Sequence, residues 1–152
     1  MDISSLPVIS AGFPSPADPF IERRINTQDL LVPHPDWTFF ARADGDSMSG
    51  AGIHSADVLV IDRSLDATQH AVVVAILNGS FIVKRIQYQG DHILLLSEHH
   101  RYPPIRVDPE RDSFSVFGVV TWSLHSMNRQ IRGSVVASPS GSPTLPQPRS
   151  RR

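Results

Sequence analysis

The sequence predicts a mostly β domain with a curled or barrel-like sheet, an extended N-terminal arm and a short helix. Short runs rich in Val, Ile and Phe alternate with turn residues between positions 38 and 125, as in a sheet of short antiparallel strands. Asn78-Gly79 lies between two of these runs, and both residue types accept the positive φ that a two-residue hairpin turn requires. Few other segments have the period of a helix.

The predicted organisation is an arm over residues 1–17, a folded domain over 18–128 and a tail over 129–152. Prolines in the arm push the residues before them toward extended backbone. Asp18-Pro19 provides an N-cap followed by proline at the first helical position, so the short helix is expected at Phe20–Ile25. The tail is rich in Gly, Ser, Pro and Arg and is predicted to be flexible, because it has little apolar surface to bury.

Alternation of apolar and polar residues predicts the strands of the domain. The predicted strands are Thr38–Ala43, Asp57–Asp62, Val72–Leu77, Phe81–Gln87, His92–Leu96 and Ser113–His125. The aromatic residues Trp37, Phe39 and Phe40 are expected in the core. Asp57 and Asp62 flank a strand and are expected to act as turn or cap residues.

The composition excludes several classes of function. A net charge of −1 provides no basic field, so direct specific DNA binding is not expected. The chain has no cysteine, no apolar run near the ~20 residues of a membrane span, and no signal peptide, so a cytoplasmic protein is expected. Its histidines lack metal-ligand spacing and no Gly-rich phosphate loop is present, so neither metal nor cofactor is predicted.

Lys84 is unusual because 13 of the 14 basic residues are Arg and it is the single Lys. It lies in the predicted strand Phe81–Gln87, on the face that also has Ile82 and Ile86. If that face points inward, burial favours the neutral amine, which is able to accept a proton. An Arg would keep its proton. A surface lysine lying over the sheet is the alternative.

The segment Gly45-Asp46-Ser47-Met48 directly follows a predicted strand. Gly45 allows a sharp turn that would present the Ser47 hydroxyl near backbone N–H groups, as an oxyanion hole requires. Most serines in Gly-rich turns have no catalytic role, and only the presence of Lys84 favours one here. A Ser–His–Asp triad stays open as an alternative, although no single histidine stands out.

Four segments of the chain together resemble a known protein family. Ala11–Ala17 resembles the cleavage-site segment of UmuD proteins, and Gly45–Met48 resembles the nucleophile motif of the LexA/UmuD/phage-repressor proteases. Phe81–Arg85 resembles the segment with the catalytic lysine of that family, and Phe117–Val120 resembles its closing strand. The order of the four motifs and the spacing from Ser47 to Lys84 also suit the family. The resemblance covers residues from about 11 to 127.

This resemblance implies a LexA-type fold and a self-cleaving serine protease. Ser47 would be the nucleophile and Lys84 the general base, with Gly45 and Met48 supporting the oxyanion turn and the scissile bond between Ala11 and Gly12. Cleavage in this family is stimulated by a RecA–single-stranded-DNA filament. The trimmed dimer then joins a UmuC-type Y-family polymerase in error-prone translesion synthesis during the SOS response.

The chain departs from the family at Ala56 and His70, where glycine is common, and at Ala11, where cysteine is common.

Homodimerisation is expected through an exposed edge of the strand around Phe114–Val120. One alternative is a truncated LexA-like or phage repressor, although the arm has no room for a helix-turn-helix domain. A second is a dimerisation module without catalytic activity. A third is a signal peptidase, which would need a membrane anchor.

Overall fold

The computed structural model describes residue 12 and residues 26–128. The chain divides into two units, Met1–Pro33 and His34–Arg152. In the first unit the described structure is a single short helix, α1 (Thr27–Leu31). Its N-cap is Asn26, whose side-chain oxygen accepts a hydrogen bond from the Gln28 N–H at 3.1 Å. The helix predicted at Phe20–Ile25 lies outside the described residues.

The second unit is a mostly β fold, as expected. Its elements are η2 (Pro35–Trp37), β1 (Thr38–Arg42), η3 (Ser49–Ala51), β2 (Val58–Asp62), β3 (Val72–Leu77), β4 (Ser80–Gln89), β5 (His92–Leu96), β6 (Ile105–Val107) and β7 (Phe114–Leu124). All strand pairs are antiparallel, in the order β1-β2-β7-β3-β4-β5-β6. The sheet stays open, because β1 and β6 are its two edges. Within the described residues, no helix has the length and apolar character that a bilayer crossing needs.

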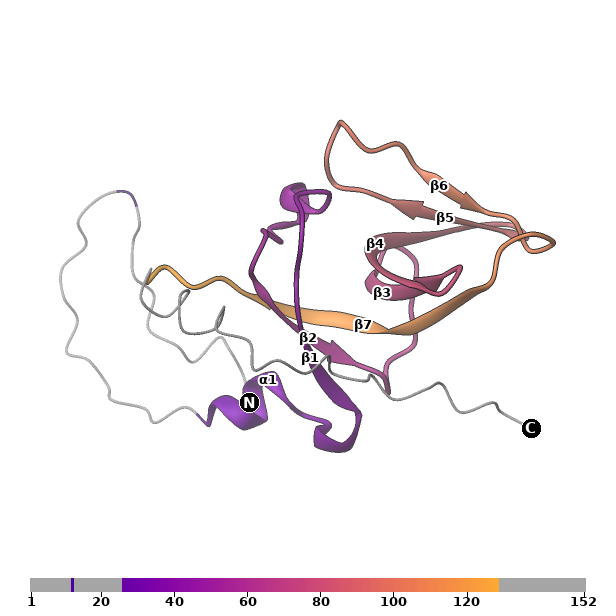
Figure 1. The fold of residues 1–152 in the computed structure, drawn as a ribbon. Coiled ribbons are helices and arrows are strands. Elements are labelled where there is room, and N and C mark those ends of the chain that lie inside the picture. The colour runs from indigo at the N-terminus through magenta and orange to yellow at the C-terminus, as the bar shows by residue number, and fades with distance from the viewer. Residues whose placement is uncertain (1–11, 13–25, 129–152) are drawn as a thin grey trace. The chain divides into compact units, whose positions relative to one another are not determined.

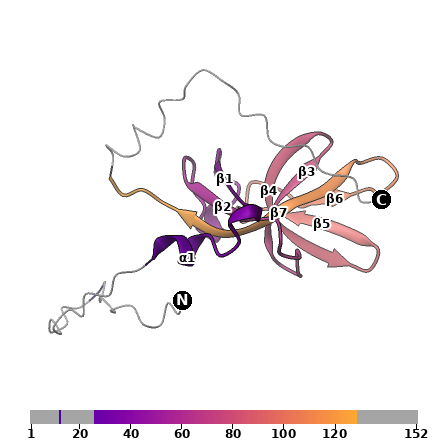
Figure 2. The same ribbon diagram turned by 90° about the horizontal axis from the view of Figure 1, so that it is seen from below.

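The long strand β7 joins the two halves of the sheet (Figures 1 and 2). Its first half, from Phe114 to Val119, pairs with β3, and its second half, from Val119 to Leu124, pairs with β2. β7 is therefore inside the sheet order and not at an edge, which corrects the expectation of an exposed strand edge around Phe114–Val120. Each half of β7 still has one side with no partner strand among the described residues.

The predicted hairpin between β3 and β4 is confirmed. Asn78 and Gly79 have φ values of 51° and 81°, as a type I′ turn requires. The Asn78 side chain donates to Asp112 Oδ1 at 2.9 Å and accepts from the Ser113 N–H at 2.9 Å. These bonds hold the tip of the hairpin against the residues that lead into β7.

The core consists of two buried clusters. One contains Ala43, Met48, Ile53, Leu59, Ile61, Val74 and Phe117, and the other contains Val73, Ala75, Ile86, Leu95 and Val107. Strand β3 contributes to both, which explains its uninterrupted apolar sequence. Phe39 packs against the first cluster as predicted. Trp37 and Phe40 are each 55% exposed, so their assignment to the core was wrong. Phe40 alternates with Phe39 along β1, an edge strand with a solvent-facing side.

Two residues at positions where the family often has glycine adopt left-handed backbone. Ala56 has φ 73° and His70 has φ 65°, values that cost non-glycine residues free energy. Both are next to turns of the sheet, where the Ala56 N–H donates to Ala43 O and the His70 N–H donates to Ile86 O, each at 2.9 Å. Both residues thus have the left-handed backbone that glycine adopts without strain.

Asp62, at the end of β2, is buried and accepts several hydrogen bonds. Ser64 donates to Oδ1 through its backbone N–H at 2.8 Å and its hydroxyl at 2.6 Å, and His34 Nδ1 lies 2.6 Å from Oδ2. Burial by itself raises the pKa of Asp62, but the bonds from Ser64 and His34 outweigh it and hold the pKa below the ordinary 3.8. The predicted turn role is therefore confirmed, and the histidine partner was not foreseen.

Asp62→Asn should lower the free energy of unfolding near neutral pH by about 1–3 kcal/mol, because a buried, charged acceptor is lost. The folded-state pKa is depressed, so the carboxylate stabilises the fold above the pKa of the unfolded chain, and this gain is lost as pH falls through the folded-state pKa. Urea unfolding at pH 7 and at about pH 3 tests this. The exposed Asp66→Asn should change little, and an equal loss for Asp62→Asn at both pH values would contradict the explanation.

Candidate active site

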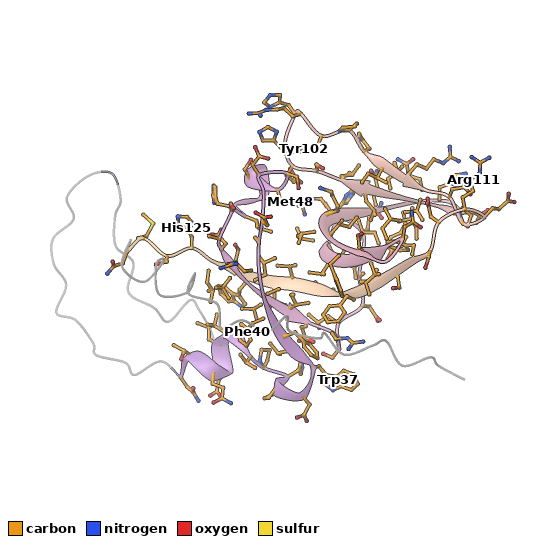
Figure 3. The ribbon with its side chains drawn as sticks, viewed as in Figure 1. Trp37, Phe40, Met48, Tyr102, Arg111 and His125 are labelled. Atoms are coloured by element: carbon orange, nitrogen blue, oxygen red, sulfur yellow. The ribbon has the colours of Figure 1, made fainter. Side chains whose placement is uncertain are left out.

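Ser47 lies in a tight turn immediately after β1. Gly45 has φ 87°, a left-handed value that glycine adopts without strain. The Ser49 N–H donates to Asp46 O at 3.1 Å, and the Ile53 N–H donates to Met48 O at 3.2 Å. The Met48 side chain is buried in the first core cluster (Figure 3). Met48 therefore fixes the turn to the sheet and leaves the Ser47 side chain at the surface of the core.

Glu98, just beyond β5, holds this turn through its backbone. The Glu98 N–H donates to Ser47 O at 2.9 Å, and the Gly50 N–H donates to Glu98 O at 2.8 Å. A Cβ at Gly50 would lie 2.5 Å from that oxygen, so only glycine permits the approach. The Glu98 carboxylate also pairs with Arg85 of β4. Glu98 thus joins the serine turn to the strand that has the lysine.

Lys84 lies in the middle of β4, opposite Val73 of β3. Its face of the strand includes Ile86, which is fully buried, and Ile82, which is half-buried. The lysine side chain is itself buried, and this desolvation lowers the pKa of Lys84 from its ordinary 10.5. The sequence predicts a buried lysine only if the face with Ile82 and Ile86 points inward. In the structure this face does point inward.

The two side chains meet directly. Lys84 Nζ lies 2.8 Å from Ser47 Oγ, and it is 5.7 Å from the centre of the Tyr102 ring. An amine with a lowered pKa spends more time neutral, and a neutral amine at hydrogen-bond distance is able to take the proton of a hydroxyl. The arrangement is chemically suited to activating Ser47 as a nucleophile. Among the described residues, no histidine is recorded in hydrogen-bond contact with Ser47, so the geometry gives no support to a Ser–His–Asp triad.

A loop after β5 provides residues that the sequence did not reveal. The Tyr102 hydroxyl donates to Asp46 Oδ1 at 2.5 Å, and His99 Nε2 lies 3.9 Å from Asp46 Oδ2. The bond from Tyr102 lowers the pKa of Asp46, and Asp46 in turn raises the pKa of Tyr102. This loop therefore holds the residue before Ser47 and also covers the Lys84 amine. In the sequence, the adjacent histidines His99 and His100 mark this loop, but their spacing alone does not indicate a role.

A cavity of about 400 Å³ opens beside the two side chains. Its lining includes Ser47 and Lys84 and is otherwise mostly apolar: Phe39, Phe40, Ala41, Ala43, Met48, Ile53, Leu59, Ile61, Val74, Phe81, Ile82, Val83 and Phe117. An apolar pocket with a few convergent polar groups is the usual form of a binding site. Its size suits a short stretch of extended peptide.

The structure brings together four of the six predicted site residues. Ser47 and Lys84 are in contact, and Gly45 and Met48 form the turn around the serine. Ala11 lies outside the described residues. Gly12 is an exposed bend in the first unit.

Comparison with known proteins identifies the family. The Peptidase S24-like family matches residues 5–121. The chain belongs to this family. Protein MucA of Salmonella typhimurium is 41% identical over 116 residues, which cover 76% of this chain and 79% of MucA. Protein ImpA of Escherichia coli is 35% identical over 127 residues, covering 80% of this chain and 81% of ImpA.

A LexA repressor of Ralstonia pickettii (strain 12J) is 37% identical over 112 residues, covering 73% of this chain but 51% of the repressor. The resemblance deduced from the motifs is thereby confirmed: this S24-like chain is a UmuD-type member of the LexA/UmuD family. It belongs with the serine-type autopeptidases, and it is similar over most of its length to MucA and ImpA.

Lys84→Met should raise the free energy of unfolding near pH 7, on the order of 1 kcal/mol, because an apolar chain of similar length replaces a buried amine. The lysine's depressed pKa penalises folding below that pKa, and the penalty disappears as pH rises toward the pKa of the unfolded chain. The gain should therefore shrink at about pH 10. Thermal unfolding in a Ser47→Ala background measures it, and a loss of stability at pH 7 would contradict the interpretation.

Proposed function

We propose that this S24-like chain is a cytoplasmic SOS-response autoprotease that cleaves its own arm between Ala11 and Gly12. Ser47 is the nucleophile and Lys84 is the general base. The observation that supports this most directly is the 2.8 Å contact between a buried lysine amine and the serine hydroxyl. The family match over residues 5–121 supports the same chemistry.

The reaction begins when neutral Lys84 Nζ accepts the proton of Ser47 Oγ. The oxygen attacks the Ala11 carbonyl carbon, and the negative charge that develops on the carbonyl oxygen is stabilised by N–H groups of the Gly45–Met48 turn. The Lys84 ammonium then donates its proton to the Gly12 amine as the peptide bond breaks. Water, deprotonated by the same lysine, attacks the resulting ester of Ser47. The Lys84 ammonium returns this proton to Ser47 Oγ as the acyl–oxygen bond breaks, and the arm is released.

The apolar cavity beside Ser47 is the proposed site for the arm. A segment with small residues at the scissile bond is able to lie close to the serine turn, and Ala11-Gly12 satisfies this. Phe40 and Phe81 are 55% and 46% exposed at the cavity. Cover by an extended peptide would remove this apolar surface from water.

The proposed partners follow from the UmuD-type family. A RecA–single-stranded-DNA filament stimulates cleavage, and the trimmed homodimer becomes the accessory subunit of a UmuC-type Y-family polymerase. The relatives MucA and ImpA support this assignment at the level of the family. The second side of each half of β7, which lacks a partner strand among the described residues, is the proposed place for pairing between two copies.

Incubation with an activated RecA filament should yield a larger product that begins at Gly12, measured by intact mass and N-terminal sequencing. The rate should rise with pH, with an apparent pKa well below the ~10.4 of a free lysine, because burial lowers the pKa of Lys84. Ser47→Ala and Lys84→Arg should each abolish cleavage, since one removes the nucleophile and the other keeps its proton.

The matched control is Ser49→Ala, which removes a hydroxyl from the same turn and should still cleave. A product that begins elsewhere would overturn the assigned bond. Cleavage of Lys84→Arg at the wild-type rate would overturn the role of Lys84 and require a different base.

Sedimentation at micromolar concentration should give a dimer of the 16.8 kDa chain. The physical reason is that the sides of β7 that lack a partner strand among the described residues are able to pair with a second copy. A monomer across the concentration series would count against homodimerisation and against the proposed role with a polymerase.

A further inference from the structure

Three potential metal ligands come together at the end of the sheet away from the hairpin tip. Asp57 immediately precedes β2 and His125 immediately follows β7. The pairing of Val58 with Leu124, continued by one residue, sets Asp57 opposite His125. His54 lies three residues before Asp57, in the turn that its backbone N–H closes by donating to Asp57 Oδ2 at 2.8 Å. Figure 3 shows His125 at this end of β7.

The donor atoms of these residues are close to one another. His125 Nδ1 lies 2.5 Å from Asp57 Oδ1, and His54 Nδ1 lies 3.7 Å from Asp57 Oδ2. The two imidazole rings are 5.3 Å apart between centroids, at an interplanar angle of 62°. One donor atom from each residue lies within 4.8 Å of the other two. A tetrahedral ion with bonds of about 2.0–2.1 Å needs donors roughly 3.3 Å apart, so small side-chain rotations are sufficient.

The carboxylate is held in place by groups around it. Asp57 is 1% exposed, and besides the His54 N–H its Oδ2 accepts a hydrogen bond from the Ser123 hydroxyl at 3.2 Å. These bonds leave Oδ1 directed toward His125. Hydrogen bonds of this kind orient the ligands in established metal sites. The side chains of His54 and His125 are 54% and 36% exposed, so an ion and a water molecule have access from solvent.

We propose that His54, Asp57 and His125 form a binding site for a zinc-type divalent transition-metal ion, with a fourth position open to water. Two imidazole nitrogens and one carboxylate oxygen are donors that Zn²⁺ accepts, whereas Mg²⁺ and Ca²⁺ prefer oxygen alone. The ion would lie between Asp57 Oδ1 and His125 Nδ1, in place of the hydrogen bond that joins them. This site is separate from the proposed peptidase function and does not depend on it.

A bound ion would join the turn after η3 to the end of β7. Asp57 O accepts from the Ala43 N–H at 2.8 Å, and Ala43 leads into the turn that holds Ser47. The ion would therefore stabilise the backbone behind the serine turn without contacting the reacting atoms. The competing explanation is an Asp57–His125 ion pair that holds the end of β7 and binds no metal.

The test is a calorimetric titration of Zn²⁺ into the full chain after chelator treatment, with Co²⁺ absorption as a second readout. We expect one Zn²⁺ per chain with micromolar or tighter affinity, a higher melting temperature with Zn²⁺, and the visible spectrum of a tetrahedral Co²⁺ site. His54→Ala should weaken binding at least about tenfold. It keeps the backbone bond to Asp57, so the fold should be preserved.

His92→Ala removes a histidine from β5, on a different part of the sheet, and should bind Zn²⁺ like the wild type. His125→Ala should lose binding as His54→Ala does, and circular dichroism verifies that both variants are folded. Absence of micromolar binding, or an undiminished affinity in folded His54→Ala, would overturn the proposal. Equal weakening by His92→Ala would show adventitious surface binding and would also overturn it.

Discussion

The candidate active site depends on one contact, in which the buried amine of Lys84 lies against the hydroxyl of Ser47. Burying an amine in the middle of a sheet costs free energy unless the amine has a hydrogen-bond partner. Here the Lys84 amine lies 2.8 Å from the Ser47 hydroxyl. The same burial that makes Lys84 costly also lowers its pKa. Stability and chemistry are therefore opposed at this point, as they often are in active sites.

The rest of the unit can be understood as support for that contact. β4 supplies Lys84, and the turn after β1 supplies Ser47. In the sheet order these segments are separated by β2, β7 and β3. Contacts other than strand pairing are therefore needed to hold them together. Glu98 does so with two backbone hydrogen bonds to the turn and a side-chain pair with Arg85. Tyr102 completes the arrangement by binding Asp46 and covering the amine.

The sequence predicted the strands well because their signals are local. Val72–Leu77 and His92–Leu96 were predicted with the bounds observed, and the hairpin at Asn78-Gly79 was recognised from two residues. Strand β6 was missed because its three residues are too few to show alternation. Phe40 was wrongly assigned to the core because aromatic residues are usually buried. The sequence does not show that its strand is at the edge of the sheet, with one face in water.

By itself the sequence determined the fold class, the family motifs and the two residues of the proposed chemistry, because a single lysine among arginines and a serine beside a turn glycine can be seen in the sequence alone. The tertiary structure decided which groups surround them. Glu98, Tyr102 and Asp46 meet through loop geometry, and His54 and His125 meet at Asp57 because β2 and β7 pair in one register. Strand pairing and loop closure bring together residues that are far apart along the chain. The residues next to each position in the sequence do not indicate which distant residues it will contact.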